Sequence, residues 1–383
     1  MRNFPVRRHW RMLLLLGCLG AAAEGFLYAQ DAPGTQSTEP VAKPRKKDAP
    51  AAAGSTEELP KIPSKFHKEK EPEASATFKS EATTVTVDVA VMDNKGHFIP
   101  NIPAGNFRIL EDGTPQQISS ASHSEAPMTV CLLIEFSNLF QQYWSSGWYQ
   151  TLTAAYGFTE TLKPEDYVAV IAYDLKPEIL SDFTQDRMKT QEALSRLRIA
   201  GFSESNLYDA LVDTETRMEN IEGRKAIVLI ASGIDTFSKL TFDKARKAIQ
   251  ESAVPVYAIG LLQALREILD ARGYMGSIQR LDFLQADNQM KTFAKETGGQ
   301  AYFPRFYGEF PSIFHSIQEA LRNQYTFSYH PTNTARDGSY RRIKVELVNP
   351  ATGDPLRVVD EKGKPIKYQI IAKAGYKAPR EVE

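Results

Sequence analysis

The feature that most constrains the fold is an uninterrupted apolar segment that ends in polar side chains. It spans residues 128–139 and reads MTVCLLIEFSNL. Because its apolar residues are consecutive rather than alternating, both faces of the segment are expected to be buried, as in a central strand of a parallel sheet. Open α/β sheets bind ligands beyond the carboxyl ends of such strands. Glu135, Ser137 and Asn138 are therefore predicted to lie at a binding site.

Further apolar segments alternate with amphipathic stretches. The strand-like segments YVAVIAYD, KAIVLIAS and VPVYAIG span residues 167–174, 225–232 and 254–260. Helical patterns are expected at residues 149–162, 188–197, 207–221, 242–252, 283–297 and 310–323. This alternation predicts an α/β fold with a doubly wound, mostly parallel sheet flanked by helices.

The segments on either side of this α/β region have a different pattern. Residues 82–92, ATTVTVDVAVM, alternate apolar and polar side chains, and three strand-like segments return near the C-terminus. Alternation indicates half-exposed antiparallel strands. Because the two ends of a domain often lie close together, we predict that the α/β domain, 126–324, is inserted in a small antiparallel β-unit. That β-unit would consist of residues 81–125 and 325–378.

The first 80 residues predict export and a tether. Four arginines among the first eleven residues precede an apolar stretch, which is the pattern of a secretory signal peptide ending near Ala29. Cys18 follows Leu-Leu-Gly, so lipidation at this cysteine is an alternative. Residues 30–80 are rich in Pro, Ala, Lys, Glu and Ser, which predicts a disordered linker. The expected location is periplasmic, secreted or associated with the cell envelope.

Charge and motif content argue against several function classes. A formal net charge of -1 provides no overall field that would attract nucleic acid. The strings HExxH, GxSxG, GxGxxG and the P-loop do not occur. Cys131 lies inside the apolar segment, where a buried thiol has a raised pKa and is a poor nucleophile. We therefore expect a protein without enzymatic activity, and a hydrolase of an envelope polymer is the alternative.

Three polar loops are expected to meet at the carboxyl edge of the sheet. They read EFSNL after the first strand, SESN before residue 207, and SGID from residue 232. In this order they resemble the metal-ion-dependent adhesion site of the von Willebrand factor A (VWA) fold, which uses Asp-x-Ser-x-Ser, a Thr and a third-loop Asp. The segments NFRILEDGTPQQI, SNLYDAL, ASGIDTFS and DGSYRRIKV make the chain similar to the acidobacterial VWFA-related family.

The resemblance implies a Mg²⁺ site, and this sequence departs from the pattern of that site at several positions. Glu135 replaces the Asp, Ser137 is retained, and Leu139 replaces the second Ser. Ser205 stands in place of the Thr, and Ser232 in place of the third-loop Asp. Leucine offers no oxygen ligand, and a neutral hydroxyl binds a hard cation less strongly than a carboxylate does. The implied cofactor is therefore none, or a weakly bound Mg²⁺.

The resemblance assigns two groups of residues to this degenerate site. The candidate metal ligands are Glu135, Ser137, Ser205 and Asp235, and the candidate ligand-binding rim is Asn138, Leu139, Ser232 and Trp144. An alternative is that Glu135, Ser137 and Ser205 only satisfy backbone groups at strand ends and cap helices.

The predicted function is protein binding or adhesion through this rim. Trp144 belongs to an aromatic segment, FQQYWSSGWYQ, and aromatic residues are enriched at protein interfaces. Alternatively, these aromatic residues pack the first helix onto the sheet. For the protein as a whole, the alternative is a structural scaffold of the cell envelope without a ligand site. The sequence does not identify the partner.

Overall fold

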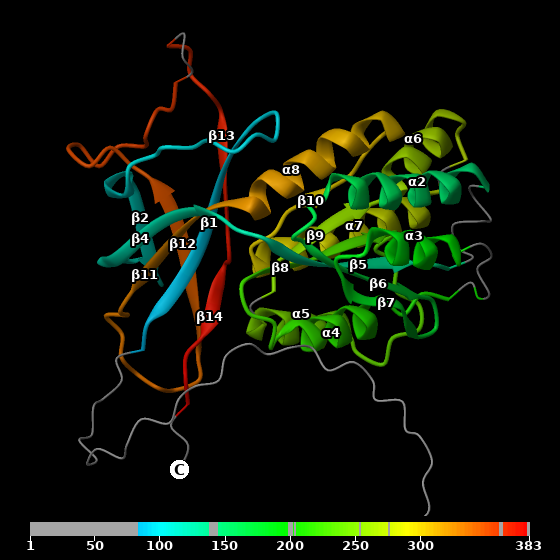
Figure 1. The fold of residues 1–383 in the computed structure, drawn as a ribbon, viewed down its shortest axis with the longest axis horizontal. Helices are drawn as coiled ribbons and strands as arrows, with labels where there is room; N and C mark the ends of the chain where they lie inside the picture. Colours follow the sequence, from blue (N-terminus) through cyan, green and yellow to red (C-terminus); the bar gives the residue numbers. More distant parts are fainter. Residues whose placement is uncertain are drawn as a thin grey trace, which may run out of the picture. The chain divides into compact units, whose positions relative to one another are not determined.

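The computed structural model describes residues 83–137, 145–197, 202, 204–252, 254–274, 276–359 and 363–380. The predicted signal peptide and linker, together with Asn138, Leu139 and Trp144, lie outside these described residues. The described chain contains a six-stranded sheet flanked by helices and two four-stranded sheets (Figure 1). None of the helices in these ranges is long and apolar enough to cross a membrane.

The six-stranded central sheet is mostly parallel. Its strand order is β10-β9-β8-β5-β6-β7, and only the edge strand β7 runs antiparallel to its neighbour. The strands are β5 (Met128–Glu135), β6 (Tyr167–Tyr173), β7 (Pro177–Thr184), β8 (Arg224–Ala231), β9 (Val256–Gly260) and β10 (Ala301–Tyr302). As predicted from the apolar segment, β5 lies in the middle of the sheet.

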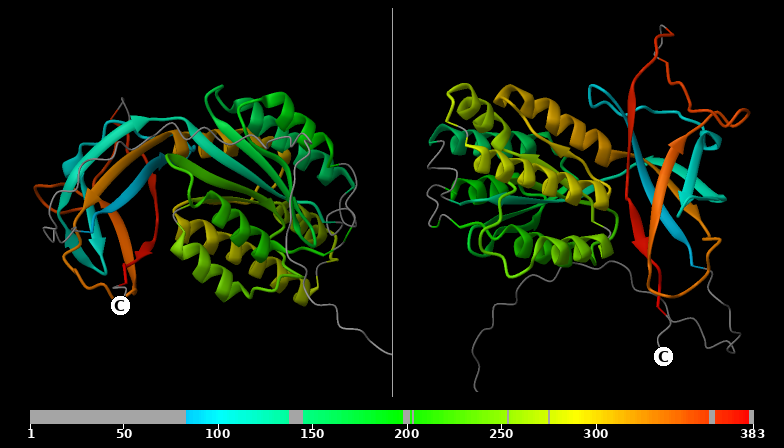
Figure 2. Two further views of the ribbon diagram at one scale, coloured as in Figure 1. Left: turned by 60° about the horizontal axis from the view of Figure 1, so that its bottom comes forward. Right: turned by 180° about the vertical axis from the view of Figure 1, so that it is seen from behind.

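Helices cover both faces of this sheet (Figure 2), which confirms the doubly wound α/β class. Along β5, Val130 and Leu132 contribute to the core on one face, and Cys131 and Leu133 to the core on the other. On the first face lie α2 (Ser145–Thr161), α3 (Arg187–Ser195), α6 (Leu262–Ala271) and α8 (Phe310–Arg322). On the second lie α4 (Leu207–Met218), α5 (Phe242–Glu251) and most of α7 (Ser277–Thr297).

Strands from before and after the α/β region pair in two further sheets. Their orders are β13-β1-β11-β4 and β14-β12-β2-β3. The earlier strands are β1 (Val85–Asp93), β2 (Phe107–Glu111), β3 (Thr114–Gln116) and β4 (Ile118–Glu125), and short 3-10 helices lie at Ala104–Asn106 and Tyr307–Glu309. The later strands are β11 (Asn323–Tyr329), β12 (Tyr340–Leu347), β13 (Tyr368–Ala372) and β14 (Gly375–Lys377). We call these two sheets, which enclose one apolar core, the β-unit.

Strand β1 is more buried than its alternating sequence predicts. Val87 and Val89 face the core of the β-unit, and the polar residues between Val85 and Val89 are exposed, as expected. Farther along, Ala90 and Met92 are also buried, because their face of the strand joins the core that contains α8. The β-unit and the α/β region therefore share buried surface along the second half of β1.

Candidate functional site

The candidate site lies at the carboxyl end of the central sheet. Strand β4 ends at Glu125 and β5 begins at Met128, so the amino end of β5 adjoins the β-unit and its carboxyl end points away from it (Figure 1). Glu135 is the last residue of β5, Ser232 directly follows β8, and Ser205 precedes α4. Because β5 and β8 are parallel neighbours, their ends deliver Glu135 and Ser232 to the same place.

A buried carboxylate is the centre of this site. Glu135 is 0% exposed. Its Oε1 accepts a hydrogen bond from Ser137 Oγ at 2.8 Å. Its Oε2 accepts one from the backbone N–H of Ser232 at 2.7 Å and one from Ser232 Oγ at 2.8 Å. Burial raises the pKa of the Glu135 carboxyl, and these hydrogen bonds lower it by less. Both carboxylate oxygens are therefore already engaged by the protein.

Two more hydroxyl groups lie beside this carboxylate. Ser205 is 0% exposed and Tyr173 is 1% exposed. The Ser205 hydroxyl interacts with both the Glu135 carboxylate and the Tyr173 hydroxyl and acts to lower the pKa of each, but no well-formed hydrogen bond joins these groups within the described residues. Burial and the charges of Glu135 and Asp235 raise the pKa of Tyr173 well above its usual value, so this phenol is neutral. The structure thus brings Glu135, Ser137, Ser205 and Ser232 together.

Asp235 has a different position from these four residues. Its Oδ1 accepts hydrogen bonds from the backbone N–H groups of Leu207 at 2.9 Å and Tyr208 at 3.3 Å, and it also accepts one from the Ser238 hydroxyl. These N–H groups belong to the first two residues of helix α4. The N-cap residue of that helix, Asn206, makes no capping hydrogen bond with its own side chain. Asp235 therefore caps α4 from another loop, a role that sequence reasoning did not assign to it.

The described residues do not fit a magnesium site. Mg²⁺ requires near-octahedral oxygen ligands and is usually held through one or two carboxylates. Both oxygens of Glu135 accept hydrogen bonds, and Asp235 is committed to the amides of α4. No group of three or more His, Cys, Asp or Glu side chains in the described ranges could hold a metal ion. The metal-binding role of Glu135, Ser137, Ser205 and Asp235 stays a prediction.

Exposed aromatic side chains lie on the loops that surround this buried network. Phe202 is 51% exposed and Phe237 is 56% exposed. The two loops are joined through Ser205: its N–H donates to Thr236 Oγ1 at 2.8 Å, and its carbonyl accepts from the N–H groups of Thr236 at 2.9 Å and Phe237 at 3.1 Å. Phe237 is thus presented by a loop with a fixed backbone.

Helix α7 adds apolar residues at the same end of the sheet. Thr297, the last residue of α7, accepts a hydrogen bond from the N–H of Val256 at the start of β9, so the first turns of α7 lie toward the carboxyl end of the sheet. Gly233, with a φ of +80°, allows the loop after β8 to pack directly on Met290 of α7, because a Cβ atom there would lie 2.6 Å from its sulfur.

Six of the ten large apolar residues that are most exposed in the described chain belong to segments at this end. We call them the apolar rim: Phe202, Phe237, Tyr274, Leu281, Leu284 and Phe306. Sequence reasoning did not identify them. The available signal was a single phenylalanine in each of two otherwise polar loops, GFSESN and IDTFSK. Exposed apolar residues on a monomer surface are normally scattered, so six of the ten at one end of the sheet is an uneven distribution.

Comparison with protein-family models gives no match, and comparison with curated proteins gives none either. Among solved structures, the vWF domain of the type V pili tip protein Mfa5 from Porphyromonas gingivalis is 13% identical and matches with a TM-score of 0.39, over 51% of this chain and 97% of that chain. Protein BatB from Bacteroides thetaiotaomicron is 14% identical, with a TM-score of 0.36, over 50% of this chain and 98% of that chain.

A third solved structure covers more of the chain. The von Willebrand factor type A protein from Catenulispora acidiphila is 11% identical, with a TM-score of 0.38, over 79% of this chain and 76% of that chain. Likenesses at this level say nothing about function. The chain is similar to von Willebrand factor A-type domain proteins, in agreement with the prediction from its loop motifs.

Proposed function

We propose that this protein is an exported, non-enzymatic module that binds a protein partner through the carboxyl end of its central sheet, without a metal ion. The observation that carries the proposal is the apolar rim, which lies on segments surrounding a buried hydrogen-bonded network. Large exposed apolar clusters mark sites of interaction with other proteins. Aromatic anchors surrounded by polar groups are typical of the residues that dominate binding energy.

The buried network supports binding by fixing the loops in advance. Glu135 ties the end of β5 to the first residue after β8. Ser205 ties the loop before α4 to the loop that carries Phe237. Loops that are ordered before binding lose less conformational entropy when the partner arrives, so more of the contact energy appears as affinity. The polar residues at the strand ends would then not contact the partner themselves, and would instead hold the loops that carry the apolar side chains in position.

The chemistry of the buried carboxylate supports a binding module over a catalyst. A general acid or base must reach the substrate within hydrogen-bonding distance, directly or through a water molecule. Glu135 is 0% exposed, and three hydrogen bonds from serine groups occupy its two oxygens. Oε2 already accepts two of these hydrogen bonds, so only Oε1 retains acceptor capacity. Its role in the proposal is therefore structural.

Export is the part of the proposal that rests on sequence. The basic segment and apolar stretch of the first 29 residues, followed by a polar linker, would place the folded part in the periplasm, outside the cell or at the envelope. Lipidation at Cys18 is the alternative to ordinary cleavage. An exported protein would meet its partner at or beyond the cell envelope, and a polar linker would allow the rim to reach it.

Photo-crosslinking tests the rim directly. With a benzoylphenylalanine in place of Phe237 in the full chain, we expect one specific protein of the native cell envelope to be crosslinked and identified by mass spectrometry. The same probe in place of Met188 is the control, since Met188 is 79% exposed but opens α3 at the other end of the sheet. Phe202→Ser is then expected to weaken the identified partner's binding about tenfold or more, because it removes an apolar anchor.

The melting temperature of Phe202→Ser should stay close to that of the parent, because the side chain is exposed. Equal crosslinking at positions 188 and 237, or full binding by Phe202→Ser, would contradict the proposal. Those outcomes would favour the envelope scaffold, in which no patch of the surface stands out.

Calorimetric titration with Mg²⁺ and Mn²⁺ tests the metal-free part of the proposal. We expect no saturable heat from the parent chain, because its candidate oxygen ligands are neutral or already hydrogen-bonded. A Leu139→Ser, Ser232→Asp double variant is expected to bind the cation, since it adds a hydroxyl four residues after Glu135 in the sequence and a carboxylate at the position whose backbone N–H contacts Glu135. Comparable heats from both proteins would show that the parent holds a cation through other residues.

A further inference from the structure

A cavity lies at the amino end of the central sheet, opposite the candidate site. It has a volume of about 400 Å³ and lies between β1 and β13 of the β-unit and the starts of β8 and β9. Small-molecule sites in proteins fall in the range of about 300–1,000 Å³. The residues that matter for its chemistry are Tyr257, Lys373, Asp88, Lys225, Ile221 and Ile371. None of them takes part in the apolar rim, so this cavity is independent of the proposed function.

The Tyr257 hydroxyl is a buried polar group that lacks a partner. Tyr257 is 0% exposed, and its hydroxyl makes no hydrogen bond within the described ranges. Burial raises the pKa of this phenol, and the charge of Asp88, which also lines the cavity, raises it further. The hydroxyl is therefore neutral and able to donate. Buried hydroxyl groups nearly always have hydrogen-bond partners, because leaving one unpaired costs its full desolvation.

Lys373 is the second unusual group in this cavity. It follows β13, and the chain there is fixed on the end of α7: the N–H of Ala374 donates to the carbonyl of Glu296, and Gly298 leaves no room for a Cβ atom beside the backbone of Lys373. Burial lowers the pKa of the Lys373 ammonium, and the charge of Asp88 opposes this shift. Within the described residues, Lys373 makes no ion pair at 4 Å or less.

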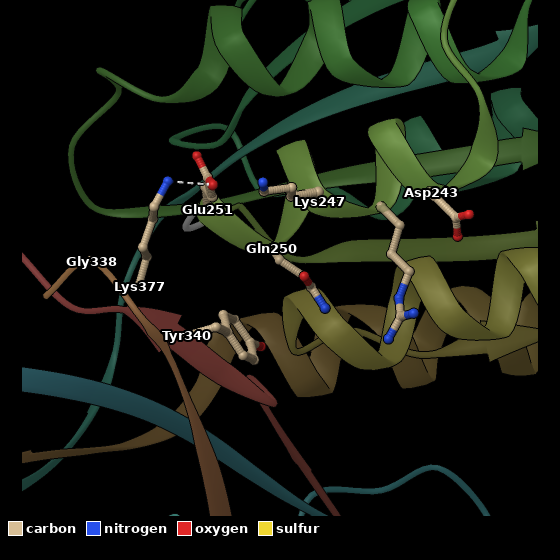
Figure 3. Close-up of a pocket in the computed structure, with 8 residues that line it drawn as sticks. Asp243, Lys247, Gln250, Glu251, Gly338, Tyr340 and Lys377 are labelled. Atoms are coloured by element: carbon tan, nitrogen blue, oxygen red, sulfur yellow. Dashed lines mark hydrogen bonds and ion pairs between the residues drawn. The ribbon is translucent and has the colours of Figure 1, made fainter.

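The other lysines nearby have partners, which makes Lys373 the exception. Lys225 Nζ, in the same cavity, donates to the carbonyls of Met218 at 3.0 Å and Glu219 at 2.6 Å. Lys377, four residues after Lys373, forms an ion pair with Glu251 at 2.5 Å across the groove between β14 and α5 (Figure 3). Asp88 lines the cavity with Lys373, but no ion pair at 4 Å or less joins the two among the described residues, so the Lys373 ammonium keeps capacity to bind a further anion.

We propose that this cavity binds a small monocarboxylate with an apolar body. The carboxylate pairs with the Lys373 ammonium and accepts a hydrogen bond from the Tyr257 hydroxyl. The apolar body lies against Ile221 and Ile371. Asp88 also lines the cavity, with its carboxylate held by the Thr326 hydroxyl at 2.6 Å. Its charge disfavours ligands with more than one negative charge, which is why a monocarboxylate fits better than a phosphate or a dicarboxylate.

Isothermal titration calorimetry of the full chain with benzoate tests this proposal. We expect one saturable site for benzoate, and binding of the neutral isostere benzamide that is about tenfold weaker or undetectable. Lys373→Met removes the charge but retains most of the stem, and it is expected to weaken benzoate binding about tenfold or more. Tyr257→Phe retains the ring and is expected to weaken binding severalfold.

Lys377→Met is the matched control, since this lysine belongs to the same β-unit but does not line the cavity, and its benzoate affinity should equal that of the parent. Thermal unfolding curves establish that each variant is folded. Absence of a saturable site for benzoate would overturn the proposal. So would equal affinity for benzoate and benzamide, or an unchanged affinity in folded Lys373→Met.

Discussion

Replacing Glu135 with alanine is expected to lower the free energy of unfolding by about 3 kcal/mol, one of the two largest effects that we predict. The substitution leaves three buried donors without an acceptor: the Ser137 hydroxyl, the Ser232 hydroxyl and the Ser232 N–H. An unpaired buried donor costs about 1–3 kcal/mol, and partial relaxation of the loops reduces the sum. Urea-induced unfolding at pH 7, followed by circular dichroism, measures the loss.

The Glu135→Gln variant distinguishes the contribution of the hydrogen bonds to stability from the contribution of the negative charge. Its carbonyl oxygen can accept from Ser232, and its amide can donate to the Ser137 hydroxyl, so most of the stability should be retained. If glutamine were as damaging as alanine, the negative charge itself would be essential, which would imply a cation beside Glu135. If alanine cost less than about 1 kcal/mol, the network would not hold the strand ends together.

The Glu135 variants also connect stability to function. Ser232 begins the loop that carries Phe237, and its N–H and hydroxyl both depend on Glu135. Loss of the carboxylate should therefore increase the mobility of this loop and weaken partner binding even where the chain stays folded. Glu135→Gln should bind the partner nearly as well as the parent does. A supporting role for the buried network therefore requires that the parent and Glu135→Gln bind the partner more tightly than Glu135→Ala does.

The sequence predicts the central sheet well because burial on both faces has a simple signature. Consecutive apolar residues in β5, β6, β8 and β9 are sufficient to identify these strands. Strand β7 was not predicted, because it is an edge strand whose sequence, PEILSDFT, shows neither an apolar run nor strict alternation. Strand β10 has only two residues, and helix α6 begins two residues after β9 ends, without a turn signal between them.

The candidate site was predictable only in part, because some roles depend on contacts between distant segments. The approach of Glu135 and Ser232 follows from the alignment of two parallel strands. The capping of α4 by Asp235 does not, since it joins residues 28 positions apart through a loop whose path the sequence does not specify. The exposure of Phe237 is similarly nonlocal: a phenylalanine beside buried strands would ordinarily be assigned to the core.

A pH-dependent loss of stability at Glu215 is the other large effect that we expect. Glu215 lies on α4, is 3% exposed, and accepts a hydrogen bond from the Ser252 hydroxyl on Oε2. Its Oε1 has no partner among the described residues. Burial raises the pKa of the carboxyl from 4.5 to about 8, although the Ser252 hydroxyl and the charge of Lys225 act in the opposite direction. The folded protein therefore retains a proton that the unfolded chain releases.

The sign of the effect follows from this difference in proton binding. Below pH 4.5 both states are protonated, and Glu215 contributes its full stability. Between pH 4.5 and about 8 the folded state holds the extra proton, so the free energy of unfolding falls by about 1.4 kcal/mol per pH unit from this group. Above this window both states are ionised and the contribution is constant. Glu215→Gln removes the titration, while its carbonyl can still accept from Ser252.

Urea unfolding of the parent and Glu215→Gln at pH 5, 6, 7 and 8 tests this expectation. The glutamine variant should gain stability relative to the parent at each step, so that the two curves diverge by several kcal/mol across the window. Glu222→Gln, an exposed position just after the same helix, is the control and should follow the parent. Parallel curves for Glu215→Gln would mean that the folded protein holds an ionised carboxylate there, which would require a cation to approach Oε1 more closely than Lys225 does.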